Sequence, residues 1–182
     1  MSGVGATAPG AGRVLVAGLG NIFLGDDGFG VAAVAALAQH PLPPRVETAD
    51  IGVRGVHLAY RLLDGYETVL LLDATARGGK PGTVYLIEDA VASGEGAVVD
   101  GHRMTPDAVL ALLGTLCDST GGTRPGRVLV VGCEPACLDE GIGLSGPVTA
   151  AVDEAAALVL RLLAADTRRP APPVERTKET QP

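Results

Sequence analysis

The chain has 182 residues, of which 47% are hydrophobic and 3% aromatic, and its formal net charge at pH 7 is -7. This length and apolar content predict one domain with a sizeable core. The negative charge, without a cluster of lysine and arginine, argues against nucleic-acid binding and against binding to an anionic membrane surface.

Short apolar runs alternate with longer segments of helical period, which is the pattern of strands joined by crossover helices. We therefore predict a single α/β domain, with a twisted, mostly parallel sheet of about five strands and helices on both faces. The domain should span residues 13–165, between a flexible N-terminus over 1–12 and a disordered tail over 166–182, which is rich in proline and charge. Strands are expected at 13–18, 45–50, 68–73, 82–87 and 127–132, and helices at 28–40, 54–63, 106–117 and 147–163.

The first strand leads into the most informative segment of the chain, VLVAGLGNIFLGDDGFG. Residues 14–18 are apolar or small, as in a buried strand, and we expect Gly18 and Gly20 to give the following turn its freedom in φ. Asp26 and Asp27 then stand just ahead of a helix, where the positive end of the helix dipole favours acidic groups. The two acids are therefore either helix caps or binding groups for a metal or a substrate.

The glycines after the first strand do not form a dinucleotide-binding motif. Phe23 stands where the third glycine of G-x-G-x-x-G belongs, and the helix does not open directly after the turn. The acids at 26 and 27 would also repel a pyrophosphate. The chain has neither a Walker lysine motif nor a G-x-S-x-G nucleophile elbow.

Acidic residues follow three of the predicted strands. Asp26 and Asp27 come after the first, Asp50 ends the second and Asp73 ends the third. Because ligands of an open parallel sheet collect at the carboxyl ends of its strands, these acids are expected to concentrate negative charge at one edge. A metal cation or a proton must offset that charge.

His102 supplies a nitrogen ligand near the same edge, if the helix that starts at Thr105 crosses over normally. Together, Asp27, Asp73 and His102 would make a mixed oxygen and nitrogen set suited to zinc, nickel or iron. The alternative is that His102 is an ordinary loop histidine bonded to a carbonyl oxygen.

Three cysteines, Cys117, Cys133 and Cys137, are an odd number, which fits a reducing compartment rather than a disulfide framework. The last two have a C-x3-C spacing without a second pair of zinc ligands, so we interpret them as packing or loop residues. No apolar run approaches the ~20 residues of a membrane helix, and the first residues lack the features of a signal peptide. We therefore expect a cytoplasmic protein.

The segment GLGNIFLGDDGFG resembles the G-x-G-N-x-L-x-x-D-[DE]-x-x-G signature of the maturation endopeptidases of nickel-iron hydrogenases, with Phe23 in place of the leucine. The likeness continues through Asp73 after a buried strand, PGTVYLIE, His102 ahead of a helix, and VVGCEPACLDEGIGLS. It covers nearly all of residues 13–163. Asp50 matches an aspartate of that family, but the D-G-G-T-x-G pattern often found there reads DIGVRG in this chain.

The resemblance implies an aspartyl-type endopeptidase that removes a C-terminal extension from the precursor of a hydrogenase large subunit after nickel insertion. It implies that Asp27, Asp73 and His102 are the metal-binding and catalytic residues, and that the nickel is presented by the precursor as a recognition element. Two alternatives stay open at this point: a protein that binds a maturation partner without cutting it, and another metallohydrolase on a similar sheet.

Overall fold

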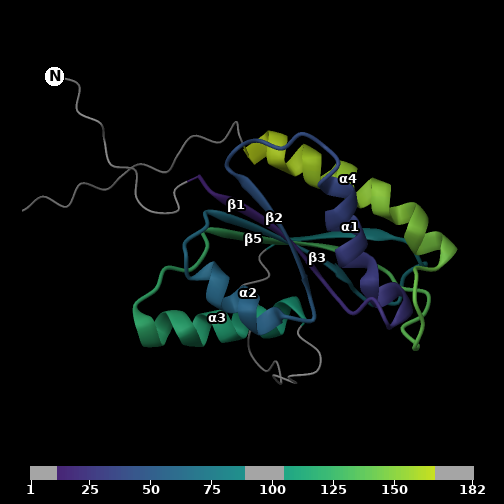
Figure 1. Ribbon diagram of the computed structural model, residues 1–182, viewed down its shortest axis with the longest axis horizontal. Coiled ribbons are helices and arrows are strands. Elements are labelled where there is room, and N and C mark those ends of the chain that lie inside the picture. The colour runs from purple at the N-terminus through teal and green to yellow at the C-terminus, as the bar shows by residue number, and fades with distance from the viewer. Residues whose placement is uncertain (1–11, 89–104, 167–182) are drawn as a thin grey trace, which may run out of the picture.

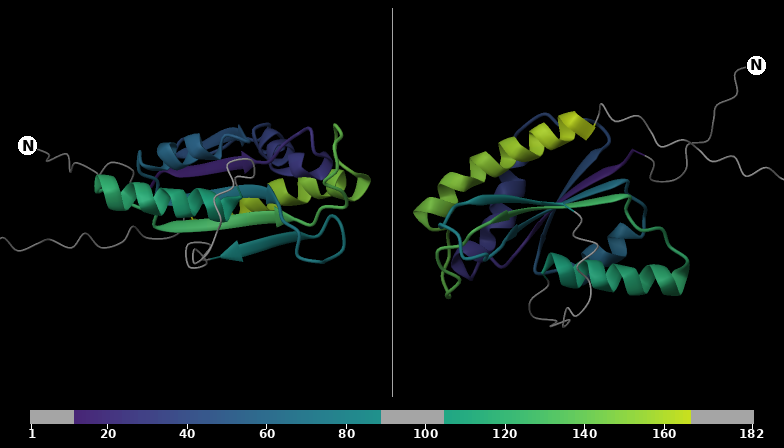
Figure 2. Two further views of the ribbon diagram at one scale, coloured as in Figure 1. Left: turned by 90° about the horizontal axis from the view of Figure 1, so that it is seen from below. Right: turned by 180° about the vertical axis from the view of Figure 1, so that it is seen from behind.

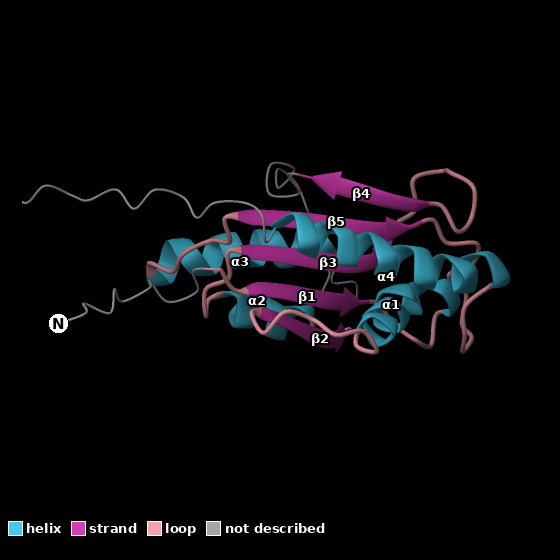
Figure 3. Cartoon of the chain, turned by 90° about the horizontal axis from the view of Figure 1, so that it is seen from above, coloured by secondary structure: helices cyan, strands magenta, loops and turns pink. Residues whose placement is uncertain are grey.

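The computed structural model describes residues 12–88 and 105–166, and within them five strands form one sheet in the order β2-β1-β3-β5-β4. Four strands are parallel, whereas β4 lies at the edge and runs antiparallel to β5 (Figure 3). The central strands β1, β3 and β5 are almost wholly buried, as expected for strands covered on both faces. The strand bounds are β1 Val14–Leu19, β2 Val46–Gly52, β3 Thr68–Ala74, β4 Val84–Glu88 and β5 Arg127–Cys133.

Helices cover both faces of this sheet, with α1 and α4 on one side and α2 and α3 on the other (Figures 1 and 2). Each pair of helices buries its own apolar cluster against the sheet, one around Val16, Phe29 and Val131 and the other around Leu15, Leu58 and Val130. Among the described residues, no helix combines the length and the apolar character needed to cross a membrane. The helix bounds are α1 Phe29–Leu37, α2 Gly55–Leu62, α3 Pro106–Thr120 and α4 Gly146–Asp166, and a 3-10 turn, η1, spans Gly25–Gly28.

Helix α1 lies directly on the backbone of β1 and β3 because glycines occupy the points of contact. A Cβ atom on Gly30 would lie 2.1 Å from the carbonyl oxygen of Leu72, and one on Gly18 would lie 2.2 Å from the carbonyl oxygen of Gly30. The expectation that Gly18 supplies turn flexibility is therefore wrong, since Gly18 lies within β1 and is required for this close approach. Only Gly20, with φ of 117°, has the backbone conformation that was expected of both.

The predicted single α/β domain with a mostly parallel sheet is confirmed, and each described element lies within a few residues of its expected position. Thr105 caps α3 as expected, with its side chain accepting a hydrogen bond from the backbone N–H of Ala108. The last helix, which was expected to end at residue 163, continues to Asp166, and Asp166 forms an ion pair with Arg45 at 3.2 Å. His102 and the expectations for residues 1–11 and 167–182 lie outside the described residues.

Candidate functional site

Two of the three expected site residues, Asp27 and Asp73, lie at the carboxyl ends of neighbouring strands. Asp73 is the next-to-last residue of β3 and is only 8% exposed, while Asp27 belongs to η1, which follows β1. The carboxylate of Asp27 accepts a hydrogen bond of 2.7 Å from the backbone N–H of Asn21. This arrangement requires glycine at position 20, because a Cβ there would lie 1.8 Å from the backbone oxygen of Asp27.

Asp73 is a buried carboxyl group, and no positively charged residue in the described part of the chain lowers its pKa. Burial raises its pKa from 3.8 to about 8, and the negative charges of Asp27 and Asp107 push the pKa in the same direction. The backbone N–H of Ala74 opposes this rise by hydrogen bonding. At neutral pH the Asp73 carboxyl group therefore either retains a proton or needs a positive ion beside it.

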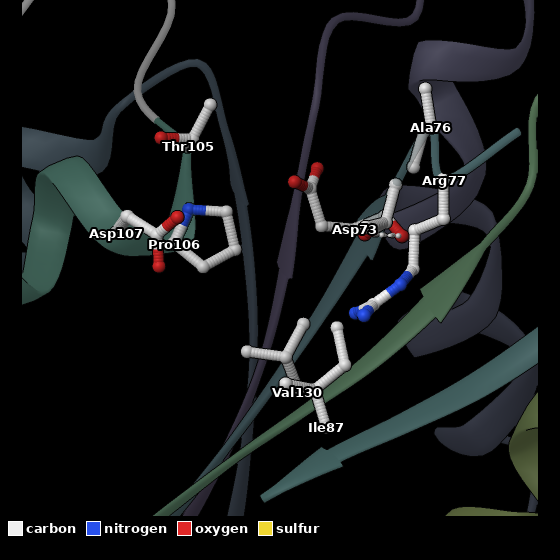
Figure 4. Close-up of a pocket in the computed structure, with 10 residues that line it drawn as sticks. Asp73, Ala76, Arg77, Ile87, Thr105, Pro106, Asp107 and Val130 are labelled. Atoms are coloured by element: carbon white, nitrogen blue, oxygen red, sulfur yellow. Dashed lines mark hydrogen bonds between the residues drawn. The ribbon is translucent and has the colours of Figure 1, made fainter. Parts of the chain in front are cut away.

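A pocket of about 410 Å³ opens beside Asp73 (Figure 4). Its walls come from the end of β3 and the loop after it, from β4 and β5, and from the start of α3. Asp107 and Arg77 bring charges of opposite sign to this pocket, and Ile87 and Val130 form its apolar floor. Asp107, whose negative charge raises the pKa of Asp73, was not among the site residues expected from the sequence, although its nearness in sequence to His102 was a signal that could have found it.

Asp26 has a different role from its neighbour, as a structural residue that joins η1 to the loop after β5. It is 1% exposed, and its carboxylate accepts hydrogen bonds from the backbone N–H groups of Ala136, Cys137 and Ser145 and from the Ser145 hydroxyl, at 2.6 to 3.1 Å. Burial acts to raise the pKa of Asp26, but these hydrogen bonds outweigh it and the pKa is lowered. Ser145 directly precedes α4, and its carbonyl oxygen accepts a hydrogen bond from the N–H of Thr149 while its hydroxyl donates to Asp26.

Asp50 and His102, which were also expected at the carboxyl edge of the sheet, are not placed beside Asp73 among the described residues. The side chain of Asp50 is exposed, and the carboxylates that act on Asp73 are those of Asp27 and Asp107. The described residues contain no group of three or more acids, histidines or cysteines placed to hold a metal ion. His102, the third residue of the expected set, is not among the residues that the structure describes.

The three cysteines are free, as expected, and Cys133 is a poor nucleophile. Burial, aided by the negative charge of Asp26, raises the pKa of the Cys133 thiol to about 11, so it stays protonated at neutral pH. Cys117 is also buried in a packed core, whereas Cys137 is exposed in the loop after β5. This distribution agrees with their interpretation as packing and loop residues.

Sequence reasoning missed a third buried carboxylate, that of Glu134, which follows β5. It is 5% exposed and accepts hydrogen bonds from the backbone N–H groups of Arg77 and Gly78, at 2.8 and 3.1 Å, and from the Tyr85 hydroxyl at 2.8 Å. These bonds lower the pKa of Glu134. The carboxylate thereby fixes the loop between β3 and β4, and only the tertiary structure places its partners, which are 49 to 57 residues away in sequence.

Comparison with known proteins gives one consistent family. A family model described as hydrogenase maturation protease matches residues 31–162. The hydrogenase expression/formation protein HupD of Rhodobacter capsulatus is 34% identical over 157 residues, which cover 84% of this chain and 72% of HupD. HoxM of Cupriavidus necator, also a hydrogenase expression/formation protein, is 33% identical over 93% of this chain and 81% of its own length.

Solved structures agree with the sequence comparisons. The hydrogenase maturating endopeptidase HybD from E. coli has a TM-score of 0.70 and 31% identity, over 84% of this chain and 93% of HybD. A hydrogenase 2 maturation peptidase from a Thaumarchaeota archaeon has a TM-score of 0.63 and 39% identity, over 83% and 97% of the two chains. The likeness to these solved structures therefore extends over most of the chain.

Proposed function

The chain belongs to the hydrogenase maturation protease family and is a hydrolase, and we propose that it removes the C-terminal extension of a nickel-iron hydrogenase large-subunit precursor after nickel insertion. In this proposal the inserted nickel is part of the substrate and acts as the recognition element. Asp27, Asp73 and His102 hold it while the scissile peptide lies beside them. The cleavage is of the aspartyl type, carried by these carboxylates.

The observation that carries the proposal is the buried carboxyl group of Asp73, whose pKa is raised to about 8 by burial and by the charges of Asp27 and Asp107. A carboxylate that lies next to two others and is 8% exposed is costly to ionise unless a cation joins it. Nickel and similar divalent ions accept carboxylate oxygen and imidazole nitrogen ligands. The donor set of Asp27, Asp73 and His102 therefore fits a metal ion that arrives with the substrate.

The residues of the site have separable tasks in this proposal. Asp73, fixed in β3, binds the incoming ion, and the hydrogen bond from Asn21 holds the Asp27 carboxylate toward the same edge. Asp73 and Asp27 would hold the nickel of the precursor, and a metal ion bound there would supply positive charge beside the carbonyl group of the scissile peptide. Asp27, which is half-buried and in reach of solvent, takes the proton of the attacking water.

The alternatives to this function are less well supported. A protein that only binds its maturation partner would not need the aspartates at 27 and 73, and the similar solved structures are described as endopeptidases or peptidases. Another metallohydrolase on a similar sheet would not match a hydrogenase maturation family over residues 31–162. A cytoplasmic location belongs to the proposal and is supported by three cysteines that are all free.

Purified protein mixed with nickel-loaded and nickel-free precursor tests the proposal, with the shift of the large subunit on a gel as the readout. We expect cleavage of the loaded precursor only, and its loss in Asp27→Asn, Asp73→Asn and His102→Ala. Asp50→Asn is the matched control, because its carboxylate is exposed and is not among the charges that raise the pKa of Asp73. Failure to cleave either form of the precursor would refute the protease function, and equal cleavage of both would refute nickel recognition.

A further inference from the structure

Arg77 places a positive charge in the pocket that Asp73 and Asp107 also line. The backbone of Arg77 is held in place by hydrogen bonds. Its N–H donates to Glu134, and Thr75 binds the carbonyl oxygen of Cys133 through its own N–H at 2.8 Å. Thr75 also fills the space over Gly132, where a Cβ atom would lie 2.6 Å from the threonine hydroxyl. The loop that carries Arg77 is thus hydrogen-bonded both to Cys133, the last residue of β5, and to Glu134, which follows it.

The side chain of Arg77 is held in place by an aromatic ring rather than by an acid. Its guanidinium carbon lies 5.7 Å from the centroid of the Tyr85 ring, and the hydroxyl of that tyrosine is bonded to Glu134. Figure 4 shows the guanidinium group above Ile87 and Val130, two apolar residues of the pocket floor. The interaction orients the charged group but uses none of its N–H donors.

Arg77 differs in this respect from most arginines in the described part of the chain. Within residues 12–88 and 105–166, it has no ion pair with a carboxylate and no hydrogen bond from its guanidinium group. The charge of Glu134 is already met by backbone N–H groups and the Tyr85 hydroxyl. By contrast, ion pairs with acids are formed by Arg13, Arg45, Arg61, Arg124 and Arg127.

We propose that Arg77 is a specificity residue that binds a carboxylate of the precursor next to the scissile bond. A guanidinium group that is oriented by an aromatic ring, and has no acidic partner among the described residues, is suited to bidentate binding of a carboxylate. The pocket is then divided by charge, with the metal and the scissile peptide at Asp73 and an acidic group of the substrate at Arg77. This inference rests on the proposed endopeptidase function and adds a substrate feature to it.

The carboxylate has two sources, an acidic side chain of the precursor near the cleavage point or the new C-terminal carboxylate of the mature subunit. The first is present before cleavage and affects binding of the precursor. The second forms only in the reaction and affects release of the product. Both sources have the same chemistry at Arg77, and the substrates used in the test separate them.

The test compares Arg77→Ala and Arg77→Lys with Lys80→Ala, a control cation on the same loop outside the pocket. We expect Arg77→Ala to lower kcat/KM on the nickel-loaded precursor about 10- to 100-fold, the usual loss for a charge-assisted bond. Arg77→Lys should lower kcat/KM less than Arg77→Ala does, and kcat/KM of Lys80→Ala should stay within about twofold of the wild-type value. Equal melting temperatures show that the variants are folded.

Two further substrates identify the carboxylate. If it is a side chain, acid-to-amide substitutions in the precursor should lower wild-type cleavage and remove the effect of Arg77→Ala. If it is the new terminus, a peptide with the final residues of the mature subunit should bind the wild type more tightly as the free acid than as the amide. Arg77→Ala should abolish that difference.

The inference is overturned if Arg77→Ala cleaves the loaded precursor like the wild type, or if its loss is the same for every form of precursor and peptide. These results differ from a failure of the proposed function, in which the wild-type protein itself leaves the precursor uncut. The peptide-binding measurement needs no cleavage and therefore tests Arg77 even in that event.

Discussion

Substitution of Asp73 by asparagine should reveal the cost of a buried carboxylate in the metal-free protein. Asparagine has nearly the same shape, can accept the hydrogen bond from the N–H of Ala74, and carries no charge at any pH. The folded state keeps the Asp73 proton up to a pKa of about 8, whereas an unfolded chain releases it near 3.8. Stability contributed by the protonated group is therefore fully present below pH 4 and is lost as the pH rises toward 8.

The size of the effect follows from the difference between the two pKa values. Each pH unit between the two pKa values is worth about 1.4 kcal/mol. From pH 5 to pH 8 the free energy of unfolding of the wild type should therefore fall by about 4 kcal/mol relative to that of Asp73→Asn. Urea unfolding with a chelator present, followed by circular dichroism, measures the free energy of unfolding of both proteins at each pH. Taking the difference between the two proteins cancels the titration of groups that they share.

The stability advantage of the variant over the wild type should be small at pH 5 and clearly larger at pH 8. Asp50→Asn, which changes an exposed carboxylate, is the control and should give a difference that varies little with pH. If the difference in free energy of unfolding between the wild type and Asp73→Asn changes by less than about 1 kcal/mol from pH 5 to pH 8, Asp73 is not a buried acid with a strongly raised pKa.

Three other predictions concern residues that support the site. Asp26→Asn should lower the free energy of unfolding in urea by about 2–4 kcal/mol, because the new NH2 group would face N–H groups that donate hydrogen bonds to the carboxylate. An unchanged midpoint of unfolding would contradict this. Glu134→Gln should lower the free energy of unfolding by about 1–3 kcal/mol and expose the loop at 75–79 to faster amide exchange, while unchanged exchange would refute its role in fixing that loop. Brief treatment of native protein with iodoacetamide at pH 7.5 should add one group, at Cys137, as intact mass and peptide mapping would show; rapid modification of Cys133 would contradict its burial and raised thiol pKa.

Local patterns in the sequence were sufficient for the elements and for the mostly parallel α/β class, but not for the order of the strands in the sheet. Continuous apolar runs predicted the buried strands β1, β3 and β5, since such runs are stable only where both faces of a sheet are covered. The threonine and proline at 105 and 106 marked the start of α3, because capping depends on residues adjacent in the chain. The family resemblance drawn from the first turn was confirmed by the comparisons.

The antiparallel direction of β4 was not predicted from its own residues. Its pairing with β5 joins residues about 40 to 50 positions apart and depends on where the loop before it is fastened. The carbonyl oxygen of Glu134 accepts the N–H of Gly82, and its N–H donates to Thr83, so the chain turns back along β5. Such contacts leave no periodic trace in the sequence.

The sequence by itself determined that acids follow the strands and that Asp26 and Asp27 stand together, but it could not separate their roles. The tertiary structure directs Asp26 to the loop at 136–145, 110 or more residues away, and brings Asp27 close enough to raise the pKa of Asp73. It also places Arg77 over Tyr85, at the opposite side of the same pocket from Asp107. Adjacent residues point in different directions along a turn, and their partners are chosen by how the sheet and helices pack, which local sequence does not encode.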